Sequence, residues 1–169
     1  MKKIICIFLA LCFLAGFVGC TAEKIPEDGY AVYYKRATPT YGSADSVIAK
    51  TYLLTGGHEN DTVYLLRKYL ASTPADGFVS PFTPDITLLS FKLEGPTAKI
   101  VLSNQIAELS GMELTIALTC LAQTVISLTG CKEVIVSAVT VQLDGQNYIT
   151  LTPDSFLMLD NSGEQQDKE

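Results

Sequence analysis

The chain has 169 residues, 48% of them hydrophobic, with twelve basic and eighteen acidic residues and a net charge of −6 at pH 7. This length allows one domain with a buried core. The excess of acidic residues argues against a basic surface that could neutralise nucleic-acid phosphates. A single histidine and no closely spaced cysteine pair predict no metal site.

The first residues have the pattern of a targeting segment. Two lysines precede an apolar run, Ile4–Val18, which is shorter than the ~20 residues that cross a bilayer comfortably. The run ends in Phe17-Val18-Gly19-Cys20, which resembles the acylation site of bacterial lipoproteins, with phenylalanine where leucine is commonest. We therefore predict a signal peptide over 1–19 and lipid attachment at Cys20. The alternative is an ordinary secretory peptide that leaves this cysteine free.

Removal of the leader takes away two lysines, so the mature chain has a larger net negative charge. An anionic membrane surface would repel this chain, and the lipid attached to Cys20 would therefore have to hold it there. Residues 20–29 are then the anchored cysteine and a polar linker with a reach of at most ~30 Å. Residues 30–159 form a single domain, and 160–169 form a disordered tail. The predicted location is the outer face of the bacterial cytoplasmic membrane, with partners on or near that membrane.

The domain is expected to begin with a strand and a helix. Tyr30–Lys35 is aromatic and β-branched, which is typical of a strand, whereas Val47–Leu54 either continues the strands or leads into the helix. Asn60 or Asp61 would cap a helix over Thr62–Ala71. The apolar stripe of this helix comprises Val63, Leu66, Tyr69 and Leu70.

A proline-punctuated loop, Gly77–Pro84, leads into a predicted hairpin. Apolar residues alternate along its two strands, Ile86–Glu94 and Thr97–Ser103, and Gly95-Pro96 suits the turn between them. Alternation indicates one buried and one exposed face. The alternating residues are Leu89, Phe91 and Leu93 on the first strand and Ala98, Ile100 and Leu102 on the second.

The longest pattern is a helix over Leu109–Thr129 that ends at Gly130 and carries no charge from Leu114 onward. Its core arc comprises Leu114, Ala117, Leu118, Leu121, Val125 and Leu128. A solvent-facing helix usually carries lysine or glutamate on its other arc. Two interpretations remain open: the neighbouring helix or the C-terminal segment covers that arc, or the arc contacts protein partners. The candidate partner surface consists of Thr115, Ile116, Thr119, Gln123, Ile126 and Ser127.

The second interpretation makes a testable prediction. If the arc is a partner surface, Thr119→Lys combined with Gln123→Glu should leave the domain folded and weaken the capture of its partners.

The C-terminal part is expected to complete the sheet. Lys132–Leu143 predicts a strand whose phase changes near Ser137-Ala138, which indicates a bulge. Asp144-Gly145 is a tight hairpin signal, with a return through Tyr148–Leu151. Phe156–Leu159 would pack as a last short element.

Cys120 and Cys131 are the cysteines of the predicted domain. On a continuous helix they would lie ~16 Å apart, whereas a disulfide needs Cα atoms within about 7 Å. We predict two free, buried thiols that pack as small hydrophobic groups.

The order strand, helix, hairpin, helix, strand predicts a two-layer α/β (α+β) fold. We expect a mixed or antiparallel sheet of about four to six strands with two helices packed on it. Over about Tyr30–Gly145 the chain resembles a GerMN domain, the module of sporulation and spore-germination lipoproteins. The matching segments are Phe78–Phe82, Leu88–Ser90, Ala98–Ser103, Ser110-Gly111, Ala122–Val125 and Leu128–Val134.

Two segments depart from the family pattern. Ile100-Val101-Leu102 stands where the family usually has an acidic residue, and the expected Leu-rich segment with a Gly-Pro turn appears only as Ser72–Gly77. The resemblance implies a membrane-tethered, non-enzymatic assembly module, with a fold similar to the ring-building motifs of secretion-system proteins. It also implies envelope protein partners, in a sporulation complex or a homo-oligomer, and no cofactor.

Two other functions are weighed against this one. A lipoprotein that binds a small ligand or cell-wall glycan would have a pocket lined by Tyr33, Tyr34, Tyr64 or Phe82. A hydrolase would need two ionisable groups that converge in a cleft. No catalytic residue is predicted, because His58 beside two glycines is typical of a loop and no nucleophile motif stands near a base.

Overall fold

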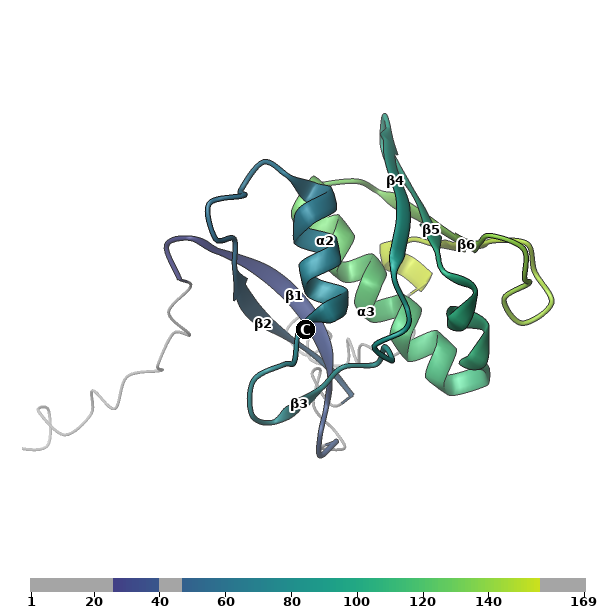
Figure 1. Cartoon of the computed structure of the whole chain (residues 1–169), viewed down its shortest axis with the longest axis horizontal. Coiled ribbons are helices and arrows are strands. Elements are labelled where there is room, and N and C mark those ends of the chain that lie inside the picture. The colour runs from purple at the N-terminus through teal and green to yellow at the C-terminus, as the bar shows by residue number, and fades with distance from the viewer. Residues whose placement is uncertain (1–25, 40–46, 156–169) are drawn as a thin grey trace, which may run out of the picture.

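The computed structural model of the chain describes residues 26–39 and 47–155 (Figure 1). The predicted signal peptide, the lipid-attachment site at Cys20, the last short element Phe156–Leu159 and the tail over 160–169 lie outside these residues. The described part has the α+β class that the sequence predicts, with its strands divided between two sheets rather than placed in one.

The first sheet has three antiparallel strands in the order β2-β1-β3. These are β1 (Gly29–Arg36), β2 (Ile48–Leu54) and β3 (Phe78–Val79). Of the two predictions for the segment before the first helix, the strand is the one observed. Its register pairs Gly29 with Leu54 and Lys35 with Ile48.

Helix α2 (Thr62–Ala71) follows β2 and contacts β4 and α3, and its carbonyl oxygens accept hydrogen bonds from the hydroxyls of Tyr30 and Tyr34 on β1. Asp61 caps it, since its carboxylate accepts a hydrogen bond of 2.9 Å from the backbone N–H of Tyr64. Leu66, Tyr69 and Leu70 are buried as predicted, and Leu65 joins them. Val63 is only half-buried.

The second sheet has the order β4-β5-β6-β7 and is mixed. It contains β4 (Leu88–Glu94), β5 (Thr97–Leu102), β6 (Glu133–Ala138) and β7 (Ile149–Leu151). Strands β5 and β6 are parallel, and the other neighbours are antiparallel. A parallel pair needs a crossover, which η1 (Asn104–Glu108) and α3 (Gly111–Thr129) supply. Short η2 (Pro153–Ser155) ends the described chain.

The prediction of one long strand with a bulge after the second helix is wrong. Strand β6 ends at Ala138, and Val139 is 56% exposed in a loop. The change of phase therefore marks the end of the strand. The predicted turn is present, because Asp144 and Gly145 have φ values of 45° and 80° between a bridged Leu143 and Gln146.

Strand β4 is less buried than its alternation predicts. Leu89 is 49% exposed and Leu93 is 46% exposed, whereas Phe91 packs against the core. A register shift between Leu88 and Ser90 turns the side chain of Leu89 away from the core. The hairpin also extends beyond α2, so nothing among the described elements covers its tip (Figure 1).

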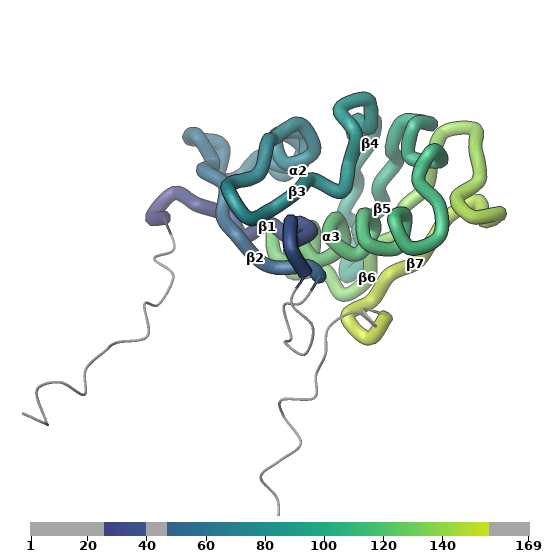
Figure 2. Tube along the Cα trace, turned by 90° about the horizontal axis from the view of Figure 1, so that it is seen from below, coloured from purple at the N-terminus to yellow at the C-terminus, as the bar shows by residue number. Residues whose placement is uncertain are grey.

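Helix α3 lies between the two sheets. It packs against β1 on one side and β6 on the other (Figures 1 and 2). Its C-terminus is the one predicted, since Gly130 has φ 68° and its N–H donates to the carbonyl of Ile126. Among the described residues, α3 alone is long and apolar enough to span a membrane; it is mostly buried inside the domain, as a core helix is.

Two side chains complete the hydrogen bonding of the open edge of β1. Strand β3 pairs only with Lys35 and Arg36, which leaves the backbone of Tyr33 facing the helices. The N–H of Tyr33 donates to Oγ1 of Thr124 on α3 at 3.0 Å, and its carbonyl accepts from the hydroxyl of Tyr69 on α2 at 2.7 Å. These bonds attach the first sheet to α2 and α3. They also supply the hydrogen-bond partners that buried backbone N–H and C=O groups need.

We expect Thr124→Val to lower the free energy of unfolding by about 1–2 kcal/mol, because the N–H of Tyr33 loses its acceptor in a half-buried position. Thr119→Val is the matched control, since the hydroxyl of Thr119 bonds only to the carbonyl of Thr115 on its own helix. Urea unfolding followed by circular dichroism measures both. Equal losses in the two variants would show that the contact with β1 contributes nothing specific.

Both cysteines of the domain are free and buried, as predicted. Burial raises the pKa of the Cys120 thiol above its usual range. A thiol kept neutral in this way is unreactive and packs as an apolar group.

Candidate functional site

The predicted partner surface on α3 is largely covered. Ile116, Thr119 and Gln123 are 7%, 2% and 7% exposed. Thr115 and Ser127 are exposed, but twelve residues of helix, or ~18 Å, separate them. Ile126 is half-buried against the core. The six residues therefore do not form one accessible surface, and the prediction is corrected here.

Strands cover this arc, in place of the neighbouring helix or the C-terminal segment. Ile116 and Cys120 pack with Ile48 of β2, and Tyr33 of β1 packs against them. A threonine can lie here because its hydroxyl bonds to its own helix and leaves the methyl group for packing, as Thr119 does. The uncharged arc thus reflects burial between two sheets.

Gln123 is the exception on this arc. Neither atom of its side-chain amide has a hydrogen-bond partner among the described residues. Burying such a group costs stability unless a bond replaces the lost water. The double substitution Thr119→Lys with Gln123→Glu would place charges in this interior, so the prediction that it leaves the domain folded is also corrected.

The four aromatic residues predicted to line a ligand pocket do not share one. Tyr34 is fully buried, and its hydroxyl donates to the carbonyl of Tyr69 at 3.2 Å. Tyr33, on β1, is half-buried and packs against Ile116 and Cys120 of α3. Tyr64 is 37% exposed and stacks on His58 with ring centroids 3.8 Å apart. Of the four, Phe82 lines the cavity described next.

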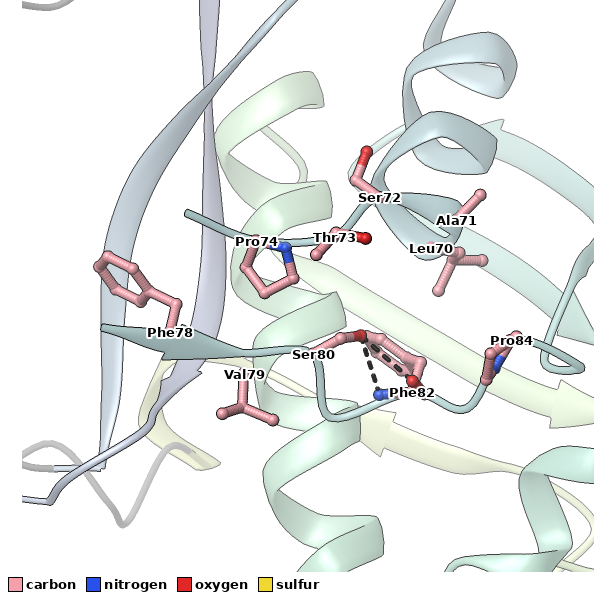
Figure 3. A pocket seen from close by; sticks show the side chains of 10 residues that line it. All are labelled: Leu70, Ala71, Ser72, Thr73, Pro74, Phe78, Val79, Ser80, Phe82 and Pro84. Atoms are coloured by element: carbon pink, nitrogen blue, oxygen red, sulfur yellow. Dashed lines mark hydrogen bonds between the residues drawn. The ribbon is translucent and has the colours of Figure 1, made fainter. Parts of the chain in front are cut away.

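A cavity of about 430 Å³ lies between the C-terminal end of α2 and the proline-punctuated loop (Figure 3). Its lining residues carry no charge. They are Leu70, Ala71, Ser72, Thr73, Pro74, Phe78, Val79, Ser80, Phe82 and Pro84. The volume falls within the usual range of ligand sites, roughly 300–1,000 Å³.

Local hydrogen bonds shape the loop wall of this cavity. Oγ of Ser80 accepts from the N–H of Phe82 and donates to its carbonyl, both at 3.2 Å (Figure 3). This places the ring of Phe82 edge-on against Tyr69, 5.7 Å between centroids. The aromatic wall therefore has a fixed position. The prolines and Ser80 of Gly77–Pro84 were the sequence signal for this wall. The prediction of a pocket lined by aromatic residues did not use them.

A second, smaller hollow of about 240 Å³ lies on the other side of Val79 and Ser80. It includes Lys35 of β1 and Glu113 in the first turn of α3. Oγ1 of Thr83, another lining residue, is buried without a partner among the described residues. Both hollows border Val79, which is 46% exposed, and together they form the recessed surface around Val79.

No ionisable residue lines the larger cavity, and the smaller hollow has Lys35 and Glu113 as its ionisable lining residues. Within the described ranges, no group of three or more histidine, cysteine or acidic residues could hold a metal ion. The clearest exposed ion pairs lie on the second sheet, where Lys92 and Lys99 both contact Glu94 and lower its carboxyl pKa to about 2. What the arrangement offers is a recess for binding.

The Germane family model, described as "Sporulation and spore germination", matches residues 31–149. Among solved structures, the tandem GerMN domains of the sporulation protein GerM from Bacillus subtilis align with a TM-score of 0.51 and 18% identity. That alignment covers 79% of this chain and 47% of GerM, so this chain spans about half of the tandem protein. At this level of identity, the structural similarity to GerM supports the fold alone.

A protein from Clostridium perfringens described as a putative lipoprotein aligns with a TM-score of 0.47 and 17% identity, over 75% of this chain and 87% of its own. Among curated proteins, none matches the chain significantly.

Proposed function

The chain belongs to the Germane family of sporulation and spore germination domains, and from this premise we propose that it is a membrane-anchored module for protein assembly outside the cell. The single observation that carries the proposal is the family match over 31–149, which spans both sheets and both helices. The module acts by binding, through the recessed surface around Val79, and no reaction is assigned to it.

The proposal extends to the way the module is held. Residues 1–19 are a signal peptide, Cys20 carries the lipid, 21–29 are the linker, 30–159 are the assembly domain and 160–169 are a tail. The domain then stands on the outer face of the cytoplasmic membrane.

A deletion strain of the organism that encodes the chain tests the function. We expect fewer heat-resistant spores or slower germination, with vegetative growth unchanged, and rescue by the wild-type chain. Normal spore yield and germination would remove the sporulation role.

The anchor has its own test in the same strain. Cys20→Ala should move the chain from the membrane fraction to the soluble fraction, because an acyl chain supplies ~0.8 kcal/mol of membrane affinity per buried CH₂. Cys120→Ala is the control, since this thiol is buried inside the fold. A Cys20→Ala chain that stays in the membrane fraction would refute the anchor.

A further inference from the structure

We propose that the cavity between α2 and the loop at Phe78–Pro84 is the docking site for an arginine side chain of a protein partner. The proposal rests on the proposed assembly function for the existence of that partner, and it adds the surface and the chemistry of the contact. Four features of the described residues support it.

The first feature is the end of α2, where two lining residues, Leu70 and Ala71, have carbonyl oxygens that no helix N–H follows to bond. Ser72 occupies two of the last carbonyl oxygens, since its hydroxyl donates to Lys68 and its N–H donates to Tyr69. The next donor along the helix would be residue 74, which is a proline and has no N–H. Among the described residues, no donor reaches the carbonyl oxygens of Leu70 and Ala71.

This helix end also favours positive charge. The C-terminus of a helix carries a partial negative charge of about half a unit. Ser72 has an extended backbone, φ −78° and ψ 140°, so the helix lacks the left-handed cap that would use the free carbonyls. A cationic donor that enters the cavity would therefore gain both hydrogen bonds and a favourable dipole.

The second feature is the aromatic and proline wall. Phe78 and Phe82 come from the loop side of the cavity, with Phe78 toward one end and Pro84 toward the other, and Pro74 lies beside the end of α2 (Figure 3). A guanidinium group stacks on aromatic faces and is weakly hydrated, whereas a lysine ammonium is a strongly hydrated point charge. The wall thus favours arginine over lysine.

The third feature is the absence of a competing cation. None of the residues that line the cavity is basic. Lys68, the nearest lysine along α2, donates its ammonium to the carbonyl of Leu54 at 2.7 Å, away from this helix end. Among the ten described residues that line the cavity, none could therefore take the place of the partner's arginine.

The fourth feature is a pair of acidic residues next to the lining segments along the chain, called here the acidic rim. Asp85 follows the lining residue Pro84 directly, and Asp76 lies two residues from both Pro74 and Phe78. Both aspartates are exposed, and neither carboxylate has a partner among the described residues. In a chain with a net charge of −6, this rim favours the approach of a basic partner.

The probe is a capped pentapeptide, Gly-Ser-Arg-Ser-Gly, titrated into the full chain in detergent micelles and followed by the backbone amide signals in nuclear magnetic resonance. Matched peptides carry citrulline or lysine at the central position. We expect saturable shifts at Ser72, Phe78 and Ser80 with the arginine peptide. The citrulline peptide, which has the same shape without the charge, should bind about tenfold more weakly.

Two pairs of variants locate the site. Ala71→Trp, at an exposed lining position, should fill the cavity and abolish the shifts, whereas Ala107→Trp, exposed on η1, should not. Asp76→Asn with Asp85→Asn should raise the dissociation constant about two- to tenfold. Glu108→Gln with Asp154→Asn makes the same change of charge at exposed positions elsewhere and should leave it unchanged.

Three outcomes would overturn the proposal. The absence of a saturable shift with the arginine peptide would remove the site. If the Asp76/Asp85 and Glu108/Asp154 double variants weakened binding equally, the peptide would be held by diffuse attraction to an acidic chain. Equal binding of the lysine peptide would refute the choice of arginine. A failure here would leave the spore phenotype of the deletion strain untouched, and normal sporulation would leave the peptide result untouched, so the two proposals fail separately.

Discussion

Thr119→Lys is expected to lower the free energy of unfolding by about 3–5 kcal/mol, because it places an unpaired charge inside the domain. Thr119 is 2% exposed between α3 and the first sheet. The longer side chain also exceeds the space that a threonine methyl group fills. Since small domains have a total stability of about 5–15 kcal/mol, the variant should be close to unfolding at 25 °C.

Ser127→Lys is the matched control on the same helix. Ser127 is exposed, so the same charge there should change stability by less than about 0.5 kcal/mol. Urea midpoints of the two variants and the wild type, measured together, decide the matter. Two similar and small losses would mean that the outer arc of α3 opens readily to water, and the partner-surface prediction would regain its basis.

The second large effect expected is a steep loss of stability above pH 10, caused by the buried tyrosines Tyr30, Tyr34 and Tyr69. Burial raises the pKa of each hydroxyl well above its usual value. Each hydroxyl also donates to a backbone carbonyl, so an anion would lose a hydrogen bond and face a carbonyl oxygen.

The sign follows from proton binding. Tyrosines in the unfolded chain release their protons near pH 10, whereas the buried ones keep theirs, so the unfolded state binds fewer protons at higher pH. Stability is therefore complete below pH 10 and falls above it, by up to about 1.4 kcal/mol per pH unit for each tyrosine. Three such groups give a slope of about 4 kcal/mol per pH unit.

Urea unfolding at a series of pH values measures this slope. Tyr69→Phe should reduce it by the contribution of one group, and Tyr148→Phe, at a position 58% exposed, should leave it unchanged. A stability that stays flat from about pH 9 to pH 11 would contradict the expected burial of the three hydroxyls.

The sequence by itself determined several helix caps and one turn. Asp61 capped α2 and Gly130 ended α3, because a cap depends on the chemistry of one or two neighbouring residues. Asp144-Gly145 formed its turn for the same reason, since its positive φ values are a local property. The free state of Cys120 and Cys131 also followed, from the length of the helix that separates them.

Only the tertiary structure decided what covers each element. The outer arc of α3 combines threonine, glutamine and isoleucine, a composition that suits a contact surface or a buried face equally. The first sheet buried it, since Ile48 of β2 and Tyr33 of β1 pack against α3. The N–H of Tyr33 also donates to Thr124 of the same helix. This contact joins residues 91 positions apart, and no local pattern contains it.

The cavity is likewise a product of packing. Its walls come from the end of α2 and from a loop that begins several residues later, and its open carbonyls depend on how Ser72 and Pro74 leave the helix. The sequence supplied the proline, the two phenylalanines and the acidic neighbours. Their arrangement around one recess required the fold, because side chains from separate segments meet only after the backbone between them has taken its path.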